Sequence, residues 1–258
     1  MVSLLTLVQS VILGILQGLT EWLPVSSSGH LVLAQRILGV NVPVAYDVLL
    51  HIGTLLPVIF IFRKDLFEII KSFARFDRKK KSFNFGVMII IASIVTGVIG
   101  FSFLKFFESL FTNITAVGIG FMVTGLFLLA SKFFHGNRGI GLKDAVIIGL
   151  AQGVSIAPGI SRSGMTISAG LIRKIDKKMI FTFSFLLSII AVLGAQAVEM
   201  KSLDLVDIGS VTNLLVGVIA AAFTGYAAIR VLLKILISDK FYVFAFYCFA
   251  VGLVAMIL

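Results

Sequence analysis

Two short stretches of this sequence place polar side chains inside strongly apolar surroundings. Residues 17–30, QGLTEWLPVSSSGH, carry a carboxylate, three hydroxyls and an imidazole, and residues 158–166, PGISRSGMT, add a guanidinium between further hydroxyls. The planar fork of arginine suits phosphate oxygens, and serine hydroxyls with backbone amides at a helix N-terminus favour an anion. Glu21 is unsuited to an anion, so we interpret it as a ligand for a hard cation that bridges phosphate oxygens, or as a base. Together these groups predict a site for a phosphate-bearing ligand.

The same stretches supply groups for phosphoryl transfer. His30 suits proton movement near neutral pH, and Ser27 suits a nucleophile that has His30 as its base. The attacking group stays open between Ser27, His30 and a water molecule. The alternative interpretation is structural: serines commonly cap or pack helices, and Glu21 with Arg162 would then be a buried ion pair.

The rest of the chain is unusually apolar. Its 258 residues are 59% hydrophobic and 13% charged, whereas soluble domains are about 25% charged. A bilayer crossing needs about 20 apolar residues, and isolated strands cannot satisfy their backbone groups in lipid. We therefore expect an all-α integral membrane protein with six transmembrane helices, at 43–62, 83–104, 112–134, 179–198, 212–237 and 241–258. The ligand would then be an anion embedded in lipid, for which a prenyl diphosphate is the obvious class.

The distribution of charge orients these spans. The net charge of +10 does not indicate nucleic acid as a partner, because the basic residues gather in short loops between apolar runs. The loop 63–81 is strongly basic and is expected on the cytoplasmic side. The short connection around Lys105 and Glu108 and the acidic loop 199–207 are then expected outside, together with both chain termini.

Two segments do not fit plain crossings. Residues 144–172 have basic residues at both ends and helix breakers, including Pro158, in the middle. This pattern predicts a re-entrant hairpin that returns to the cytoplasmic side. Residues 4–38 are interrupted at Pro24 and predict a matching hairpin that enters from outside.

The two hairpins belong to an internal repeat. With an offset of 135, residues 11–30 align with residues 146–165 without gaps and share 8 of 20 positions. Inverted repeats with broken helices usually hold their site near the membrane midplane. We therefore expect one membrane domain made of inverted repeats at about 1–135 and 136–258, with the site where the two hairpin tips meet.

The tips carry most of the candidate site residues. They are Glu21, Ser26, Ser27, Ser28 and His30 on the first tip, and Ser161, Arg162, Ser163 and Thr166 on the second. Ionisable groups at membrane depth are costly and are usually functional. Asp47 and His51 share one helix face, either as an interhelical or interfacial pair or as support for the site. Trp22 suits an anchor at the membrane interface or the route of the lipid.

These motifs give the chain a family resemblance. It resembles the undecaprenyl-diphosphate phosphatase family, the bacitracin-resistance membrane phosphatases. The family's Glu/Gln-x-x-x-Glu motif corresponds to Gln17 and Glu21, and its Ser- and His-bearing segment to residues 26–30. Its Pro-Gly-x-Ser-Arg-Ser-x-x-Thr motif is matched in full at 158–166, and YDVLLHIGTLL at 46–56 extends the resemblance over essentially the whole chain.

The resemblance implies hydrolysis of undecaprenyl diphosphate to undecaprenyl phosphate and phosphate, with Mg²⁺ or Ca²⁺ as cofactor. It also implies a site open to the extracytoplasmic face of the bacterial plasma membrane, and a role in cell-wall synthesis and bacitracin resistance. Carried over by motif, Glu21 serves the metal, Arg162 the diphosphate, and Ser27 and His30 the transfer. The substrate-binding set adds Gln17, Ser26, Ser28, Ser161, Ser163 and Thr166. Gln17 stands where some members have a second glutamate, and it supplies no negative charge.

A secondary transporter for an anion or a lipid phosphate is the competing function, because inverted repeats with broken helices are also the plan of such transporters. It would use the same arginine and serine lining, with Glu21 as a proton or sodium site. A hydrolase of this plan could also return its lipid product across the membrane. The sequence leaves open the preferred metal, the tail length of the lipid and whether the chain forms a homo-oligomer.

Overall fold

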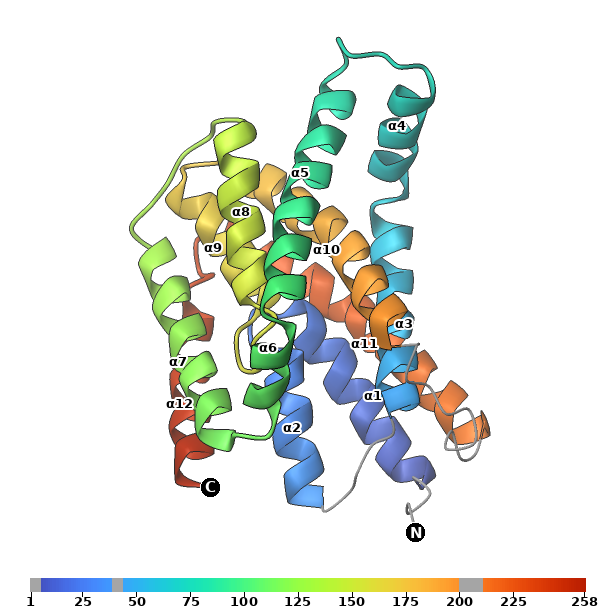
Figure 1. Cartoon of the computed structure of the whole chain (residues 1–258), viewed down its shortest axis with the longest axis vertical. Helices are drawn as coiled ribbons and strands as arrows, with labels where there is room; N and C mark the ends of the chain where they lie inside the picture. Colours follow the sequence, from blue (N-terminus) through green and yellow to red (C-terminus); the bar gives the residue numbers. More distant parts are fainter. Residues whose placement is uncertain (1–5, 39–43, 200–210) are drawn as a thin grey trace.

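A computed structural model of the chain describes residues 6–38, 44–199 and 211–258. This part of the chain is helical throughout, in twelve helices (Figure 1). They are α1 (Leu7–Trp22), α2 (Ser27–Leu38), α3 (Val44–Ile61), α4 (Arg63–Ala74), α5 (Lys81–Ser102), α6 (Leu104–Phe111), α7 (Ile114–Ser131), α8 (Leu142–Val154), α9 (Arg162–Ile172), α10 (Lys177–Glu199), α11 (Val211–Ile237) and α12 (Val243–Ile257).

Several of these helices suit a lipid bilayer. By length and composition, α5, α7, α10 and α11 can each cross a membrane, and α3 with α4 adds a fifth span, bent by 79°, if the pair is counted as one. The span expected at 241–258 is represented by α12, which has 15 residues and is about 22 Å long, against about 30 Å for the hydrocarbon core. The prediction of an all-helical membrane protein is confirmed, with four or five helices of spanning length in the described residues.

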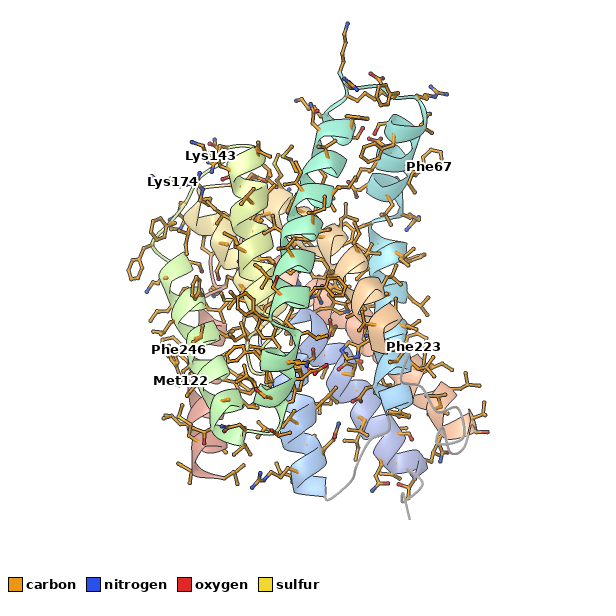
Figure 2. The ribbon with its side chains drawn as sticks, viewed as in Figure 1. Phe67, Met122, Lys143, Lys174, Phe223 and Phe246 are labelled. Atoms are coloured by element: carbon orange, nitrogen blue, oxygen red, sulfur yellow. The ribbon has the colours of Figure 1, made fainter. Side chains whose placement is uncertain are left out.

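Two stretches that we expected to be loops contain helices. Most of the basic segment 63–81 forms α4, and α6 occupies the connection around Lys105 and Glu108. In α4 apolar residues are interspersed among the charged ones. Its Phe73 packs on Gly86 of α5, while Phe67 points outward and is 65% exposed (Figure 2). Charge alone therefore concealed an amphipathic helix. The acidic loop expected at 199–207 lies outside the described residues, apart from the last residue of α10.

Two pairs of short helices have the shape of hairpins. The first pair is α1 with α2, and the second is α8 with α9. Figure 1 shows the first hairpin rising from the end of the molecule at which α12 ends, and the second descending from the end at which α4 connects to α5. The turns of the two hairpins lie at mid-height, between their open ends.

Each hairpin packs on a long helix from the other half of the chain through glycine. A Cβ atom on Gly14 of α1 would lie 2.2 Å from the carbonyl oxygen of Gly217 on α11. A Cβ atom on Gly149 of α8 would lie 2.6 Å from the carbonyl oxygen of Ala92 on α5. Small residues allow such close backbone approach between membrane helices. Gly14 and Gly149 are equivalent at the offset of 135, so both hairpins use the same device.

A cluster of charges closes the open end of the second hairpin. Asp144, at the start of α8, is only 2% exposed. Arg138 donates to its two carboxylate oxygens at 2.7 and 2.6 Å, and Arg173, just after α9, donates at 2.9 Å. A bidentate arginine contact is among the stronger ion pairs. The cluster therefore fixes the spacing between α8 and α9 far from the hairpin turn.

The glycine contacts lead to a stability prediction. We expect Gly14→Ala to lower the free energy of unfolding by about 1–3 kcal/mol, because the added methyl group forces α1 away from α11. Gly97→Ala is the matched control, since a Cβ atom there meets nothing within 4 Å. Thermal unfolding in detergent measures both variants. An equal loss in the two would contradict the role assigned to the α1–α11 contact.

Candidate active site

The first hairpin turn is built by the sequence LPVS between α1 and α2. Leu23 is extended, with φ −67° and ψ 150°, as expected for a residue that precedes proline. Ser26 has a φ of 64°, which is uncommon for a residue with a Cβ atom. Its hydroxyl accepts a hydrogen bond from the Gly29 amide at 3.3 Å. This cap starts α2 at Ser27, so the Ser27 side chain lies at a helix N-terminus.

The second hairpin turn repeats this construction. The hydroxyl of Ser161 accepts a hydrogen bond from the Gly164 amide at 3.1 Å and caps α9. Gly159 precedes it with a φ of 83°, and a Cβ atom there would lie 2.1 Å from the Val117 carbonyl oxygen, so the turn requires glycine. Arg162 is the first residue of α9, as Ser27 is of α2. The two are also equivalent at the offset of 135.

Glu21, near the end of α1, connects the two turns. Arg162 Nη2 donates to Glu21 Oε1 at 2.5 Å, and Ser27 Oγ donates to Glu21 Oε2 at 2.5 Å. Gln17 Nε2 donates to the same Oε2 atom at 3.1 Å. The Glu21 and Arg162 side chains are 5% and 15% exposed. The structure thus brings four of the expected site residues into one buried group, which includes both helix N-termini.

Two further side chains border this group. His51 Nε2, on α3, lies 3.6 Å from Glu21 Oε2, and His51 Nδ1 lies 2.8 Å from the backbone oxygen of Asp47. Of the two interpretations of the Asp47–His51 pair, the geometry favours support for the site. Trp22 is 1% exposed, so its ring packs inside the protein and does not face lipid. Instead its ring lies 5.0 Å from the Arg162 guanidinium carbon, in cation–π contact.

His30 and Ser27 have different partners. His30 Nδ1 lies 2.8 Å from the Ser26 carbonyl oxygen, and His30 Nε2 lies 2.7 Å from the Tyr247 hydroxyl. The Ser27 hydroxyl is bonded to Glu21. The direct Ser27–His30 hydrogen bond that the sequence suggested is therefore not formed in this structure. Tyr247 belongs to α12, 217 positions further along the chain, and no local pattern marked it.

The remaining tip residues hold the turns together. The hydroxyls of Ser26 and Ser28 are 3.3 Å apart, and those of Ser161 and Ser163 are also 3.3 Å apart. Ser163 additionally donates to the Leu23 carbonyl oxygen at 3.2 Å, which links the two turns. These four serines take part in capping and packing, the structural alternative that the sequence left open, at the edge of the buried group.

Thr166 points away from Glu21. Its hydroxyl lies 2.6 Å from that of Ser184 on α10 and donates to the Arg162 carbonyl oxygen at 2.9 Å. It therefore anchors α9, and it contacts the buried group only through the backbone of Arg162.

The donor atoms around Glu21 fit a hard divalent cation. The amide oxygen of Gln17 is buried and has no hydrogen-bond partner among the described residues. Buried polar atoms without partners are rare and need an explanation, and carboxylate and amide oxygens are preferred ligands of Mg²⁺ and Ca²⁺. No cluster of three or more His, Cys, Asp or Glu side chains suits a metal in the described part of the chain. A metal here would therefore be held by a single carboxylate, by neutral oxygen atoms and by oxygen atoms of the substrate.

Comparison with known proteins identifies the family of the chain. Residues 10–254 match the family model described as "Bacitracin resistance protein BacA". The chain belongs to the BacA family. It is 43% identical to the undecaprenyl-diphosphatase of Halothermothrix orenii, with 96% of each chain covered. It is 42% identical to that of Carboxydothermus hydrogenoformans over 97% of this chain and 96% of the relative, and 40% identical to that of Korarchaeum cryptofilum over 95% and 96%. Both hairpin turns lie within the range that matches the BacA family.

The buried ion pair leads to a second prediction. We expect Arg162→Met to lower the free energy of unfolding by about 3–5 kcal/mol, because it leaves the Glu21 carboxylate buried without its cation. The double variant Glu21→Gln/Arg162→Met removes both charges and should recover most of this loss. Asp239→Asn, at the partly exposed Lys177–Asp239 pair, is the control and should cost about 1 kcal/mol or less. A double variant as unstable as Arg162→Met would contradict the assignment.

Proposed function

We propose that this protein hydrolyses undecaprenyl diphosphate to undecaprenyl phosphate and inorganic phosphate, and so returns the lipid carrier to cell-wall synthesis and confers bacitracin resistance. The observation that carries the proposal is the convergence of Arg162 and the Ser27 hydroxyl on one buried carboxylate. Guanidinium and helix N-termini are the groups that bind phosphate. The BacA family match and relatives with the name undecaprenyl-diphosphatase support this substrate.

The proposed chemistry assigns one role to each group. Arg162 orients the terminal phosphate and compensates its charge. Ser27 is the proposed nucleophile: its Oγ atom forms a bond to the terminal phosphorus, the bond from phosphorus to the bridging oxygen of the lipid breaks, and the Ser27 proton passes to Glu21. Water then attacks the phosphorus, the bond from phosphorus to Ser27 Oγ breaks, and inorganic phosphate leaves. In this second step His30 takes the proton of the water, and Ser27 Oγ recovers the proton held by Glu21. The hydrogen bond from Ser27 to Glu21 supports this transfer of the Ser27 proton.

The proposed cofactor is Mg²⁺ or Ca²⁺, held by Glu21 and by the unpartnered amide oxygen of Gln17 together with substrate oxygens. A divalent ion supplies positive charge to the phosphate oxygens in the transition state. The proposed substrate site is lined around the two turns by Ser26, Ser28, Ser161 and Ser163. Thr166 also belongs to the proposed substrate-binding residues, through its hydrogen bond to the backbone of Arg162.

We infer an inverted-repeat architecture in one membrane domain, with repeats at about 1–135 and 136–258. The proposal has six crossings and two re-entrant hairpins, α1–α2 and α8–α9. It is supported by the equivalent serine caps, by the equivalent contacts of Gly14 and Gly149, and by the opposite directions in which the hairpins open.

We also propose that the site opens to the extracytoplasmic face of the plasma membrane and that both termini lie on that side. In Figure 2, Lys143 and Lys174 lie near the end where the second hairpin opens, and the basic segment that follows α4 lies at the same end. An excess of Lys and Arg is typical of the cytoplasmic side. The start of α1 and the end of α12 lie at the opposite end (Figure 1), which supports the orientation.

Phosphate release from a C15 or C55 prenyl diphosphate by purified protein in detergent tests the function. We expect release with Mg²⁺ or Ca²⁺, none with a chelator, and a loss of about 100- to 1000-fold in kcat for Arg162→Lys and for Glu21→Gln. Lysine cannot reproduce the planar fork of arginine. Arg230→Lys and Glu68→Gln make the same changes at exposed positions and should keep full activity.

The competing outcome is also specific. A folded protein that releases no phosphate with either metal would overturn the phosphatase and favour anion transport, for which the opposed hairpins are the supporting feature. Movement of a prenyl phosphate across sealed vesicles would then be the assay. Phosphate release that survives Arg162→Lys would keep the enzyme and remove Arg162 from the site.

A further inference from the structure

The ring nitrogens of His30 are both engaged, and their partners fix its tautomer. Nδ1 lies 2.8 Å from the carbonyl oxygen of Ser26. A carbonyl oxygen only accepts hydrogen bonds, so Nδ1 must carry the hydrogen. In the neutral ring the lone pair then lies on Nε2, which is 2.7 Å from the hydroxyl of Tyr247. The Tyr247 hydroxyl therefore donates to the one basic atom of His30.

The aromatic surroundings of His30 hold the ring in this orientation. Its ring is nearly parallel to that of Tyr247, at 7° with centroids 5.7 Å apart, and Phe121 meets it edge-on at 5.2 Å and 84°. The next residue of α12, Cys248, has its sulfur 3.5 Å from the carbonyl oxygen of Pro24. A helix from the second half of the chain thus contacts the turn of the first hairpin on both sides of α2's start.

A tyrosine hydroxyl is suited to this place because it can both donate and accept a hydrogen bond. It donates to Nε2 while the imidazole is neutral. When the imidazole takes up a proton, the Tyr247 hydroxyl gives its hydrogen to Nε2, its oxygen takes a hydrogen from water on the exposed side of the residue, and it then accepts the new N–H, while Nδ1 keeps its bond to Ser26. The ring thus keeps the same partners in both protonation states, and proton exchange requires no change of side-chain rotamer.

We propose that Tyr247 is a positioning residue for His30, which holds the imidazole with Nε2 as its proton-exchanging atom. The proposal rests on the phosphatase function proposed above and adds a residue that neither hairpin motif contains. Tyr247 acts through His30 and has no described contact with Glu21 or Arg162.

The hydroxyl is not needed to hold α12 in place. Helix α12 packs on α7 through glycine, since a Cβ atom on Gly118 would lie 2.9 Å from the Gly252 carbonyl oxygen. Tyr247 is 46% exposed. Phenylalanine at this position keeps the stacked ring and removes only the hydroxyl, so it separates positioning from packing.

The first experiment compares Tyr247→Phe with Tyr226→Phe. Tyr226 is the matched control because its hydroxyl has one hydrogen bond, from the exposed Arg230 at 2.9 Å. Phosphate release from a C15 prenyl diphosphate is measured with Mg²⁺ in detergent. We expect Tyr247→Phe to lower kcat about 10- to 100-fold, as when the partner of a functional imidazole is lost, with KM changed by less than about twofold. Tyr226→Phe should match the unaltered protein. An unchanged kcat in Tyr247→Phe would overturn the proposal and leave the phosphatase intact.

A double-variant comparison tests whether Tyr247 acts through His30. We expect Tyr247→Phe to cause no further loss of kcat when it is added to His30→Gln, since the imidazole that it orients is already gone. Multiplied losses would mean that Tyr247 supports activity by another route and would overturn the proposal. An unaltered protein without phosphatase activity would overturn the proposed function itself, and the positioning role with it.

A spectroscopic measurement needs no activity. The chain has three histidines, and with ¹⁵N-labelled histidine the His30 ring signals are those lost in His30→Gln. We expect a hydrogen on Nδ1 in the unaltered protein and a changed Nε2 signal in Tyr247→Phe, with Tyr226→Phe unchanged. A hydrogen on Nε2 of neutral His30, or an Nε2 signal indifferent to Tyr247→Phe, would contradict the hydrogen bond on which the proposal depends.

Discussion

The ion pair between Glu21 and Arg162 requires the rest of the structure to bring the two hairpin turns together. Its two members are 141 positions apart in the sequence, on different hairpins, and are buried. A carboxylate and a guanidinium are tolerated in such a place only when each supplies the other's charge and hydrogen bonds. Both hairpin turns must therefore end at the same depth and face one another. The capping serines set where α2 and α9 begin, the glycines of α1 and α8 set how closely the hairpins approach their supporting helices, and the Asp144 cluster holds the far end of the second hairpin.

Much of this fold is present in the local sequence, because each hairpin turn is encoded by a proline, a capping serine and a following glycine. The helices α5, α7, α10 and α11 were also predicted, because each contains an apolar run long enough to cross a bilayer. Two features were not predicted. The charges of α4 were interpreted as those of a loop, since an amphipathic helix and a basic loop share a composition and differ only in what the apolar residues contact. The last apolar run has enough residues for a crossing, but its helix begins only at Val243, because where a helix starts depends on tertiary contacts as well as on hydropathy.

The sequence likewise predicted some contacts of the candidate site and missed others. Glu21, Ser27 and Arg162 were predicted to meet because the internal repeat brings the two turns together, and the structure has them within hydrogen-bond distance. The partners of His30 were not predicted correctly. Ser27 is three residues away on the same helix and looked like its natural partner, whereas the observed partner, Tyr247, lies in an apolar run whose aromatic residues all suit a lipid-facing surface. Sequence separation gives no indication of such a contact, and only the packing of α12 beside the first turn reveals it.

The pairing of Glu21 with Arg162 also has a thermodynamic consequence. In the arrangement described here the positive charge of Arg162 is already neutralised, so a diphosphate that arrives alone adds uncompensated negative charge to a buried group. A divalent cation that arrives with it restores the balance. The affinities for the lipid head group and for the cation are then linked, and each raises the other by the same factor. With the cofactor and substrate proposed above, such a site would discriminate against either ligand by itself, and the concentration of the ion would set the affinity for the membrane-bound lipid.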